Sequence, residues 1–187
     1  MWSQLAQWLR QKLSGKSLRP HRALPPALWQ DCLRAYPFLQ NLNADEQVRL
    51  AELSARFLNE KEFHGAHGLV ITDAMAIQIA AQACLPLLYL DPSERPLIWY
   101  DDFVGIVVHP DEVRTRRTVE DELGIVHEYD EVLVGEAVEG GPVMLSWRDV
   151  QASSTETGYN VVIHEFAHKL DQRDGAADGC PLQYPCV

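Results

Sequence analysis

Residues 159–171 read YNVVIHEFAHKLD, a helical apolar pattern that contains the motif HExxH. Gly158 or Asn160 is placed to start this helix. His164 and His168 are four residues apart, so both imidazoles project from one helix face and can reach a single tetrahedral zinc ion. Glu165 follows the first histidine and can reach the water that such a metal holds. The motif therefore predicts a zinc site with two histidine ligands and Glu165 as the catalytic base.

The neighbours of the motif support this prediction. Six apolar residues are expected to bury the helix on most of its sides: Val161, Val162, Ile163, Phe166, Ala167 and Leu170. A glutamate and two histidines on a buried helix are costly unless a metal or hydrogen-bond partners satisfy them. With a metal in place the pKa of water falls, and the glutamate takes its proton as the water attacks a carbonyl. The simpler alternative, a helix with ordinary surface or core histidines, stays open, and Lys169 is charged where such helices usually carry an uncharged residue.

A strand-like stretch precedes the helix. Residues 143–147 read VMLSW and follow a Gly-Gly-Pro turn at 140–142. In zinc peptidases with this type of helix, the strand before it forms the edge of the sheet above the metal and pairs with extended substrate. Val143, Met144 and Leu145 are therefore candidate substrate-binding residues. An internal strand without substrate contact is an equally open alternative.

The remaining histidines are weaker candidates. His127 and Glu128 do not begin a second zinc motif, because Glu131 stands where the second histidine belongs. His64 and His67 lie in a stretch with two glycines and can be imagined near substrate or a second metal, but an exposed loop is the better interpretation. We leave all three histidines out of the predicted site.

A third metal ligand can be sought after the motif. Asp174 lies ten residues beyond His164, the spacing at which metzincin peptidases place their third ligand. That motif needs a glycine at the position of Asp171 to turn the chain. Asp171 therefore argues against a metzincin-like geometry, which is kept as an alternative.

The rest of the chain predicts one domain with an α+β fold. Helices are expected at residues 2–13, 28–35, 43–59 and 72–86, where apolar residues recur at helical spacing. Short runs rich in β-branched and aromatic residues predict strands at 69–71, 97–99, 104–108, 125–129, 132–134 and 143–147. The first helix and the linker up to residue 19 precede the domain proper and are expected to dock on it. The fold class is then a small mixed sheet with helices, and the metal helix comes last.

The helix at 43–59 is the most clearly marked one in the first half. Asn43 and Glu46 form a capping-box pattern at its start. Its buried side is expected to contain Val48, Leu50, Leu53, Phe57 and Leu58. The apolar stretch from Ala74 to Leu90 is interrupted by two glutamines and a proline, so it predicts a buried helix followed by a strand and not a membrane span.

Composition excludes several classes of protein. A chain of 187 residues is one ordinary domain, and its formal net charge of -11 repels nucleic acid and anionic lipid surfaces. The N-terminus lacks the pattern of a secretory signal, which favours the cytoplasm. The cysteines are scattered without CxxC spacing and are expected to be reduced thiols: Cys32, Cys84, Cys180 and Cys186.

Several stretches together resemble the Mlc titration factor A family of bacterial zinc peptidases. They are HEFAHKLD (164–171) within its GYNVVIHEF register, GPVMLSW (141–147) and ITDAMAIQIAAQACLP (71–86). The resemblance covers most of residues 20–179. It implies a zincin-like α+β fold related to the catalytic domain of anthrax lethal factor, a gluzincin-type zinc site, aminopeptidase-like activity on short peptides, and binding to the glucose repressor Mlc.

Residue by residue, the family's zinc histidines fall on His164 and His168, and its catalytic glutamate falls on Glu165. Asp171 matches the family motif and is given a supporting or helix-end role. The family's third ligand is a glutamate from a later helix, and the sequence up to Val187 does not contain it. The expectation is a single zinc-peptidase domain, 1–187, without the C-terminal helical part of the family, which binds zinc weakly and hydrolyses peptides feebly.

Three functional hypotheses stay open at this point. The first is a zinc-dependent metallopeptidase with a regulatory role. The second is a binding protein that sequesters a transcriptional repressor without hydrolysis. The third is a structural zinc helix without turnover. The sequence leaves open the physiological substrate, the group that stabilises the oxyanion, and the oligomeric state.

Overall fold

A computed structural model describes residues 23–90, 95–111, 113–120, 126–133, 135–137, 141–154 and 158–174 of the chain. It begins with α2 (Pro26–Ala35) and α3 (Pro37–Gln40), and each has a proline in its first turn. The predicted helix at 28–35 is confirmed and begins two residues earlier. A proline at the first helical position is favourable because its missing N–H has no partner there in any case. The predicted helix at 2–13 and the linker to residue 19 lie outside the described residues.

The capping box at the start of α4 (Ala44–Glu60) is confirmed. The Asn43 side chain accepts the backbone N–H of Glu46, and the Glu46 carboxylate accepts the backbone N–H of Asn43. Leu50 and Phe57 are buried as expected, whereas Val48 is 58% exposed and was wrongly assigned to the core. Two positions along a helix correspond to about 200° of rotation, so Val48 points away from the stripe that contains Leu50.

The strands predicted at 104–108 and 143–147 are confirmed, with bounds that differ by one residue, as two members of a four-stranded sheet. Its order is β1 (Glu62–Gly65), β2 (Gly105–His109), β6 (Val143–Ser146) and β5 (Gly135–Ala137). The first three strands are parallel, and β5 runs antiparallel to β6 at one edge. The α+β class with a small mixed sheet is confirmed.

The predicted strand at 69–71 is wrong, because β1 comes earlier and the chain then turns back. A Cβ on Gly65 would lie 1.8 Å from the carbonyl oxygen of Leu69, so the backbone crosses closely over this glycine. The Leu69 N–H donates to the Ala66 carbonyl within this turn. His67 adopts the left-handed conformation there, with φ of 51°. The segment therefore cannot continue as an extended strand.

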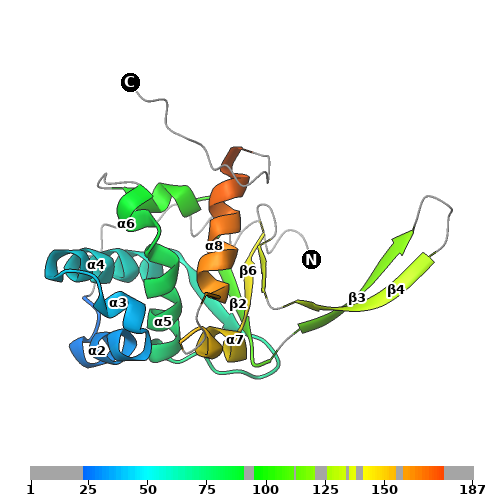
Figure 1. Ribbon diagram of the computed structural model, residues 1–187, viewed down its shortest axis with the longest axis horizontal. Helices are drawn as coiled ribbons and strands as arrows, with labels where there is room; N and C mark the ends of the chain where they lie inside the picture. Colours follow the sequence, from blue (N-terminus) through cyan, green and yellow to red (C-terminus); the bar gives the residue numbers. More distant parts are fainter. Residues whose placement is uncertain are drawn as a thin grey trace, which may run out of the picture.

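Thr72 caps α5 (Asp73–Cys84), which confirms the predicted helix. The predicted strand after it is wrong: the chain forms a second short helix, α6 (Leu87–Leu90). The stretch Asp73–Leu90 is the one helical segment in the described residues with the length and composition of a membrane span, but 56% of it is buried inside the molecule. A helix in the core of a globular protein has the same composition, and α5 lies at the centre of this fold (Figure 1).

Residues 97–99 were predicted as a strand but belong to the 3-10 helix η1 (Pro96–Tyr100). The Ile98 N–H donates to the Arg95 carbonyl, and the Asp101 N–H donates to the Ile98 carbonyl. Apolar content alone does not separate a short buried helix from a strand, so the sequence pattern was ambiguous here.

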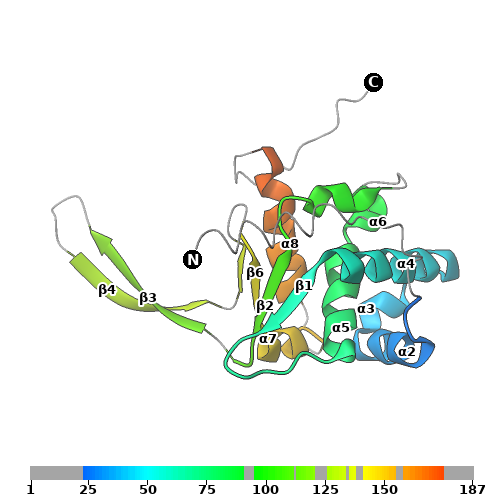
Figure 2. The same ribbon diagram turned by 180° about the vertical axis from the view of Figure 1, so that it is seen from behind.

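A two-stranded antiparallel hairpin stands apart from the main sheet. It consists of β3 (Val113–Glu120) and β4 (Val126–Leu133), and Figures 1 and 2 show it projecting from the body of the molecule. The two strands predicted at 125–129 and 132–134 are one continuous strand over 126–133. The strand at 113–120 was not predicted.

The chain returns to the body through β6, α7 (Trp147–Ala152), α8 (Val161–Asp171) and η2 (Gln172–Asp174). Figures 1 and 2 show α8 between the sheet and the helices α4 to α6. Four aromatic rings pack beneath it with centroids 5.2 to 6.2 Å apart: Phe57, Tyr100, Phe103 and Phe166. Cys32 and Cys84 are buried free thiols in the same core, as expected.

Candidate metal centre

Asn160 fixes the first turn of α8, as the sequence predicted. Its side-chain oxygen accepts the N–H of Ile163 at 2.9 Å, and its amide donates to the Gln82 side chain on α5 at 2.7 Å. The Ser153 hydroxyl at the end of α7 accepts the Val161 N–H at 3.2 Å. These bonds satisfy N–H groups that a helix start leaves without intrahelical partners. They also tie the helix to two other elements.

The two faces of α8 differ in burial. Four apolar side chains are buried beneath it: Val161, Val162, Phe166 and Leu170. His164 and His168 lie on the open face, together with Ala167 between them. Ala167 was wrongly expected to be buried. It is three residues from one histidine and one from the other, so it shares their side of the helix.

The two histidine rings are arranged as a metal site requires. Their Nε2 atoms are 3.2 Å apart, and the ring centroids are separated by 4.6 Å. Zn–N bonds of about 2.0–2.1 Å at a tetrahedral angle place two ligand nitrogens about 3.3 Å apart. Burial, with a smaller contribution from His168, lowers the pKa of His164 and so favours the neutral ring that binds metal. The pair therefore fits a zinc ion.

A complete catalytic zinc site usually has three protein ligands. Among the described residues, no group of three His, Cys, Asp or Glu side chains is close enough to hold a metal. Asp174 ends η2, but its side chain lies outside what the structure describes, as does Asp178. The described residues therefore do not test the metzincin-like alternative.

Glu165 lies on the inner side of the histidine pair. Its residue is 5% exposed, and its Oε1 atom is 4.0 Å from Nε2 of His164. A carboxylate at this distance from a ligand nitrogen can accept a proton beside the metal position without occupying it. The spacing predicted for a catalytic base is therefore present.

Lys169, the unusual charged residue of the motif, is completely buried. Its ammonium donates to the Gly141 carbonyl at 3.0 Å, lies 3.7 Å from the Asp102 carboxylate, and sits 5.1 Å from the centre of the Phe103 ring. A buried cation is tolerated when it is paired and hydrogen-bonded in this way. Lys169 therefore joins the metal helix to the turn that leads into β6.

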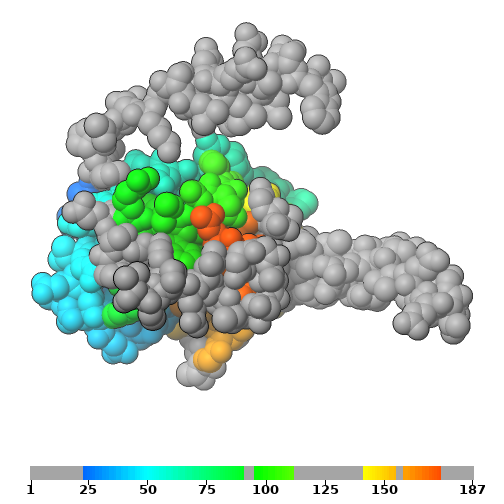
Figure 3. Space-filling model, turned by 90° about the horizontal axis from the view of Figure 1, so that it is seen from above, coloured from blue at the N-terminus to red at the C-terminus, as the bar shows by residue number. Residues whose placement is uncertain are grey.

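The C-terminal end of α8 is tied to the same region. Arg173 in η2 donates to Asp101 at 2.7 Å and lies 3.8 Å from Asp102. Figure 3 shows this end of α8 (orange-red) at the surface beside the green segment that includes η1. Asp171, which was given a supporting or helix-end role, is the last residue of α8 and is buried.

The prediction that residues 143–145 form an edge strand is wrong. In the sheet, β6 lies between β2 and β5 and pairs with both, so its backbone has no free side for a substrate. Val143 and Leu145 are also buried, and Met144 is half-buried. A substrate can add to a sheet only at an unpaired edge. The edge on this side of the sheet is β5 (Gly135–Ala137), which the sequence pattern did not reveal.

Among the described histidines, His64, His67 and His109 form no metal-binding group with His164 and His168. The His64 ring lies near Glu62 in β1, and its Nε2 atom is 3.7 Å from the Oε2 atom of that carboxylate. The His67 ring lies against the ring of His109 at the end of β2, with centroids 5.4 Å apart and the two planes tilted by 50°. The side chain of His127 lies outside the described part of the chain.

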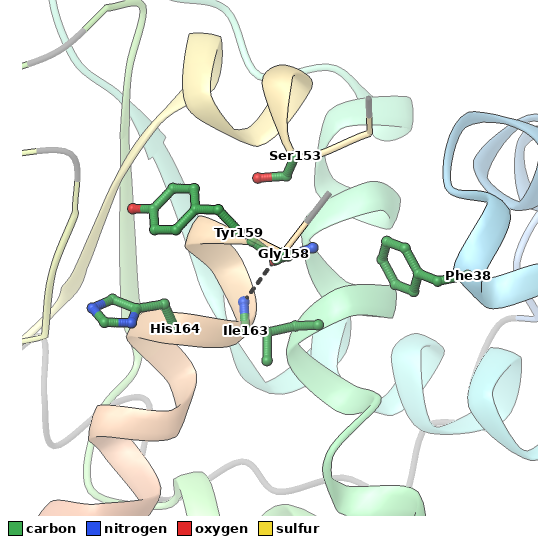
Figure 4. A pocket seen from close by; sticks show the side chains of 7 residues that line it. Phe38, Ser153, Gly158, Tyr159, Ile163 and His164 are labelled. Atoms are coloured by element: carbon green, nitrogen blue, oxygen red, sulfur yellow. Dashed lines mark hydrogen bonds between the residues drawn. The ribbon is translucent and has the colours of Figure 1, made fainter. Parts of the chain in front are cut away.

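A pocket of about 390 Å³ opens beside the first histidine. Figure 4 shows His164 and Tyr159 on one side of it and Phe38 of α3 on the other, with Ser153 and Ile163 between them. Gly158 contributes backbone in the left-handed conformation, with φ of 92°. No local sequence pattern indicates this pocket, because its walls come from three segments that meet only in the fold.

Comparison with known proteins gives a consistent result. Residues 5–185 match the model of a family described as glucose-regulated metallo-peptidase M90. The chain is 39% identical over 156 residues to Mlc titration factor A of Salmonella arizonae, covering 83% of this chain and 60% of that protein. It is 36% identical over 167 residues to Mlc titration factor A of Enterobacter sp. (strain 638), covering 88% and 61%. The chain thus spans about three fifths of the length of these relatives.

Proposed function

The chain belongs to the glucose-regulated metallo-peptidase family M90, and on that premise we propose that it is a zinc-dependent peptide hydrolase whose active centre is the open face of α8. The family implies a metal ion; zinc is the finer part of the proposal. The observation that carries it is the 3.2 Å separation of the Nε2 atoms of His164 and His168, with the Glu165 carboxylate beside them. A hydrogen bond between the two neutral rings gives the same separation, and we prefer a shared metal because the pair stands in an HExxH motif with a carboxylate beside it.

Each residue has a defined role in this proposal. His164 and His168 hold the metal through Nε2, and a third ligand comes from outside the described residues. A zinc ion bound there supplies Lewis acidity, which lowers the pKa of water toward neutrality and polarises a carbonyl group. Glu165 accepts a proton from the attacking water at Oε1 and returns it to the leaving amine.

The finer specificity follows the family resemblance. We take the activity to be aminopeptidase-like on short peptides. The relatives carry the name Mlc titration factor A, and this name favours a second candidate function, binding of the repressor Mlc. The two functions are compatible in one molecule.

Metal analysis tests the proposed site directly. We expect about one zinc per chain in the purified protein, and loss of that zinc in His164→Ala. If residues 1–187 do not contain a third ligand, we expect the protein to lose its zinc readily during dialysis against a chelator. Asp174→Ala should then leave the zinc affinity nearly unchanged, whereas a large loss would revive the metzincin-like alternative.

Hydrolysis is tested by changing the base. We expect Glu165→Gln to lower kcat on a short peptide by a factor of at least about 10² while zinc stays bound. Glu52→Gln is the matched control, because it makes the same change on the exposed side of α4. If a repressor effect survives in Glu165→Gln, sequestration and not cleavage carries it. If the protein binds zinc tightly but hydrolyses no peptide, the result would instead support the hypothesis of a structural zinc helix without turnover.

A further inference from the structure

We propose that the pocket beside His164 is a specificity pocket that accepts one uncharged, apolar side chain of the peptide substrate. The proposal rests on the proposed peptidase function, because it assigns a substrate class to the same site. It adds a recognition element that the metal motif does not contain. Phe38, Tyr159 and Ile163 are its determining residues.

The first argument is position. His164 both lines the pocket and belongs to the histidine pair, so the pocket lies next to the proposed metal position. The centre of the Tyr159 ring is 6.3 Å from the centre of the His164 ring, and Figure 4 shows the two side by side, opposite Phe38. A peptide whose carbonyl reaches the metal therefore has a neighbouring side chain within reach of the pocket. Sites that bind ligands are typically concave and next to the reacting groups.

The second argument is the chemistry of the wall. Phe38 and Ile163 supply apolar surface, and Tyr159 supplies a ring. Among the described residues that line the pocket there is no Asp, Glu, Lys or Arg. The described part of the wall therefore offers no opposite charge to a charged substrate side chain.

The third argument is that the polar groups in the wall already have partners inside the protein. The Ser153 hydroxyl donates to the Asp149 carbonyl at 2.8 Å and accepts the Val161 N–H. The Asn160 side chain caps α8 and also donates to Gln82. These groups are committed to holding the helix start and are poorly available to a ligand. An apolar side chain needs no such partner, so it matches the wall best.

The fourth argument is size and rigidity. A volume of about 390 Å³ is near the lower end of the range for ligand pockets, and it suits one side chain better than an extended peptide. The Gln82 side chain that holds Asn160 is fully buried and is itself bonded to the Gln78 carbonyl. Phe38 packs edge-on against the buried Tyr36 ring at 5.8 Å. The walls are therefore largely formed before substrate binds.

The experiment compares peptides that differ only in the residue next to the scissile bond: Ala, Leu, Phe or Glu. We expect kcat/KM for Leu to exceed that for Glu by about tenfold or more. Phe38→Trp should narrow the pocket and lower kcat/KM about tenfold for Leu and Phe, with little change for Ala. Phe38→Leu should shift the preference toward Phe. Phe63→Leu, the same change at a half-buried position of β1, should keep all ratios unchanged.

Equilibrium binding separates this proposal from the proposed function. The same four peptides are titrated into Glu165→Gln protein with and without zinc, by calorimetry. Side-chain preference in binding without hydrolysis by the wild type would support the pocket and reject the peptidase. Hydrolysis with equal rates for the Leu and Glu peptides would contradict the specificity pocket but not the peptidase function. Phe38 variants that slow the hydrolysis of all peptides equally would have the same consequence. Neither hydrolysis nor discrimination in binding would reject both.

Discussion

The two faces of α8 differ in what holds them and in what they offer. The inner face packs Phe166 among three other rings and buries the ammonium of Lys169. On the open face, the rings of His164 and His168 contact each other, and His164 also lies beside the Tyr159 ring. The comparison indicates that stability and chemistry are assigned to opposite sides of one helix. Substitutions on the inner face should then change the free energy of unfolding, and those on the open face should change metal binding.

The largest effect on stability is expected for Phe166→Ala. This ring is completely buried and contacts Phe57, Tyr100 and Phe103. Its removal leaves a cavity, and we expect the free energy of unfolding in urea to fall by about 3–5 kcal/mol. Phe63→Ala, at a half-buried ring of β1, should cost clearly less. A loss below about 1 kcal/mol for Phe166→Ala would contradict the comparison of the faces.

The buried cations on the inner side predict a pH effect. Lys61 donates to the Phe103 carbonyl at 2.7 Å and lies 4.1 Å from the centre of the Phe103 ring, on which Lys169 also sits. Burial lowers the pKa of Lys61 from 10.5 to about 8. Between these values the unfolded chain binds a proton that the folded chain has released. The free energy of unfolding should therefore rise with pH in this window, by up to about 3 kcal/mol from this group.

The measurement is urea unfolding at pH 7.5 and pH 10, for wild type and Lys61→Met. Buried acids act in the opposite direction: burial raises the pKa of Tyr36 and of Cys32 to about 12, so their stabilisation is lost as pH rises above their unfolded values. Both proteins contain these groups, so the difference between them isolates Lys61. An identical pH dependence in the two proteins would show that burial of this ammonium carries no cost.

A smaller effect is expected where α8 begins. Asn160→Ala removes the helix cap and the bond to the buried Gln82, so the free energy of unfolding should fall by about 1–2 kcal/mol. Asn43→Ala is the matched control, because it removes a cap at the exposed start of α4. The additional loss of unfolding free energy for Asn160→Ala, compared with Asn43→Ala, measures what the bond to Gln82 on α5 contributes. An equal or larger loss of unfolding free energy for Asn43→Ala would show that the bond between Asn160 and Gln82 does not stabilise the protein.

The smallest effect on stability is expected on the open face. His168→Ala should change the free energy of unfolding of the metal-free protein by no more than about 0.5 kcal/mol, because the side chain is exposed. Zinc content, measured on the same sample before chelation, should fall to background. Ala167→Ser, between the histidines, should alter neither quantity. A destabilisation of His168→Ala comparable to that of Phe166→Ala would show that the faces are not separate in function.

Local features were predictable wherever a short stretch fixes its own structure. The capping box at Asn43 and Glu46 formed as predicted, and Asn160, one of the two residues predicted to start α8, caps that helix. Strands were less predictable. Residues 97–99 form a 3-10 helix and residues 69–71 turn back over Gly65. Short apolar runs are compatible with either structure until neighbouring segments decide between them.

The sequence by itself determined the metal helix: its span, its cap and the spacing that puts two histidines on one side with Glu165 between them. Helical periodicity and capping act within a few residues, so no distant contact is needed for these features. The tertiary structure alone decided that β6 is an inner strand, that Lys169 is buried against Phe103, and that Phe38 and Tyr159 line one pocket beside the first histidine. Each of these depends on which distant segments pack together. Burial and sheet order are properties of the whole fold and not of any local pattern.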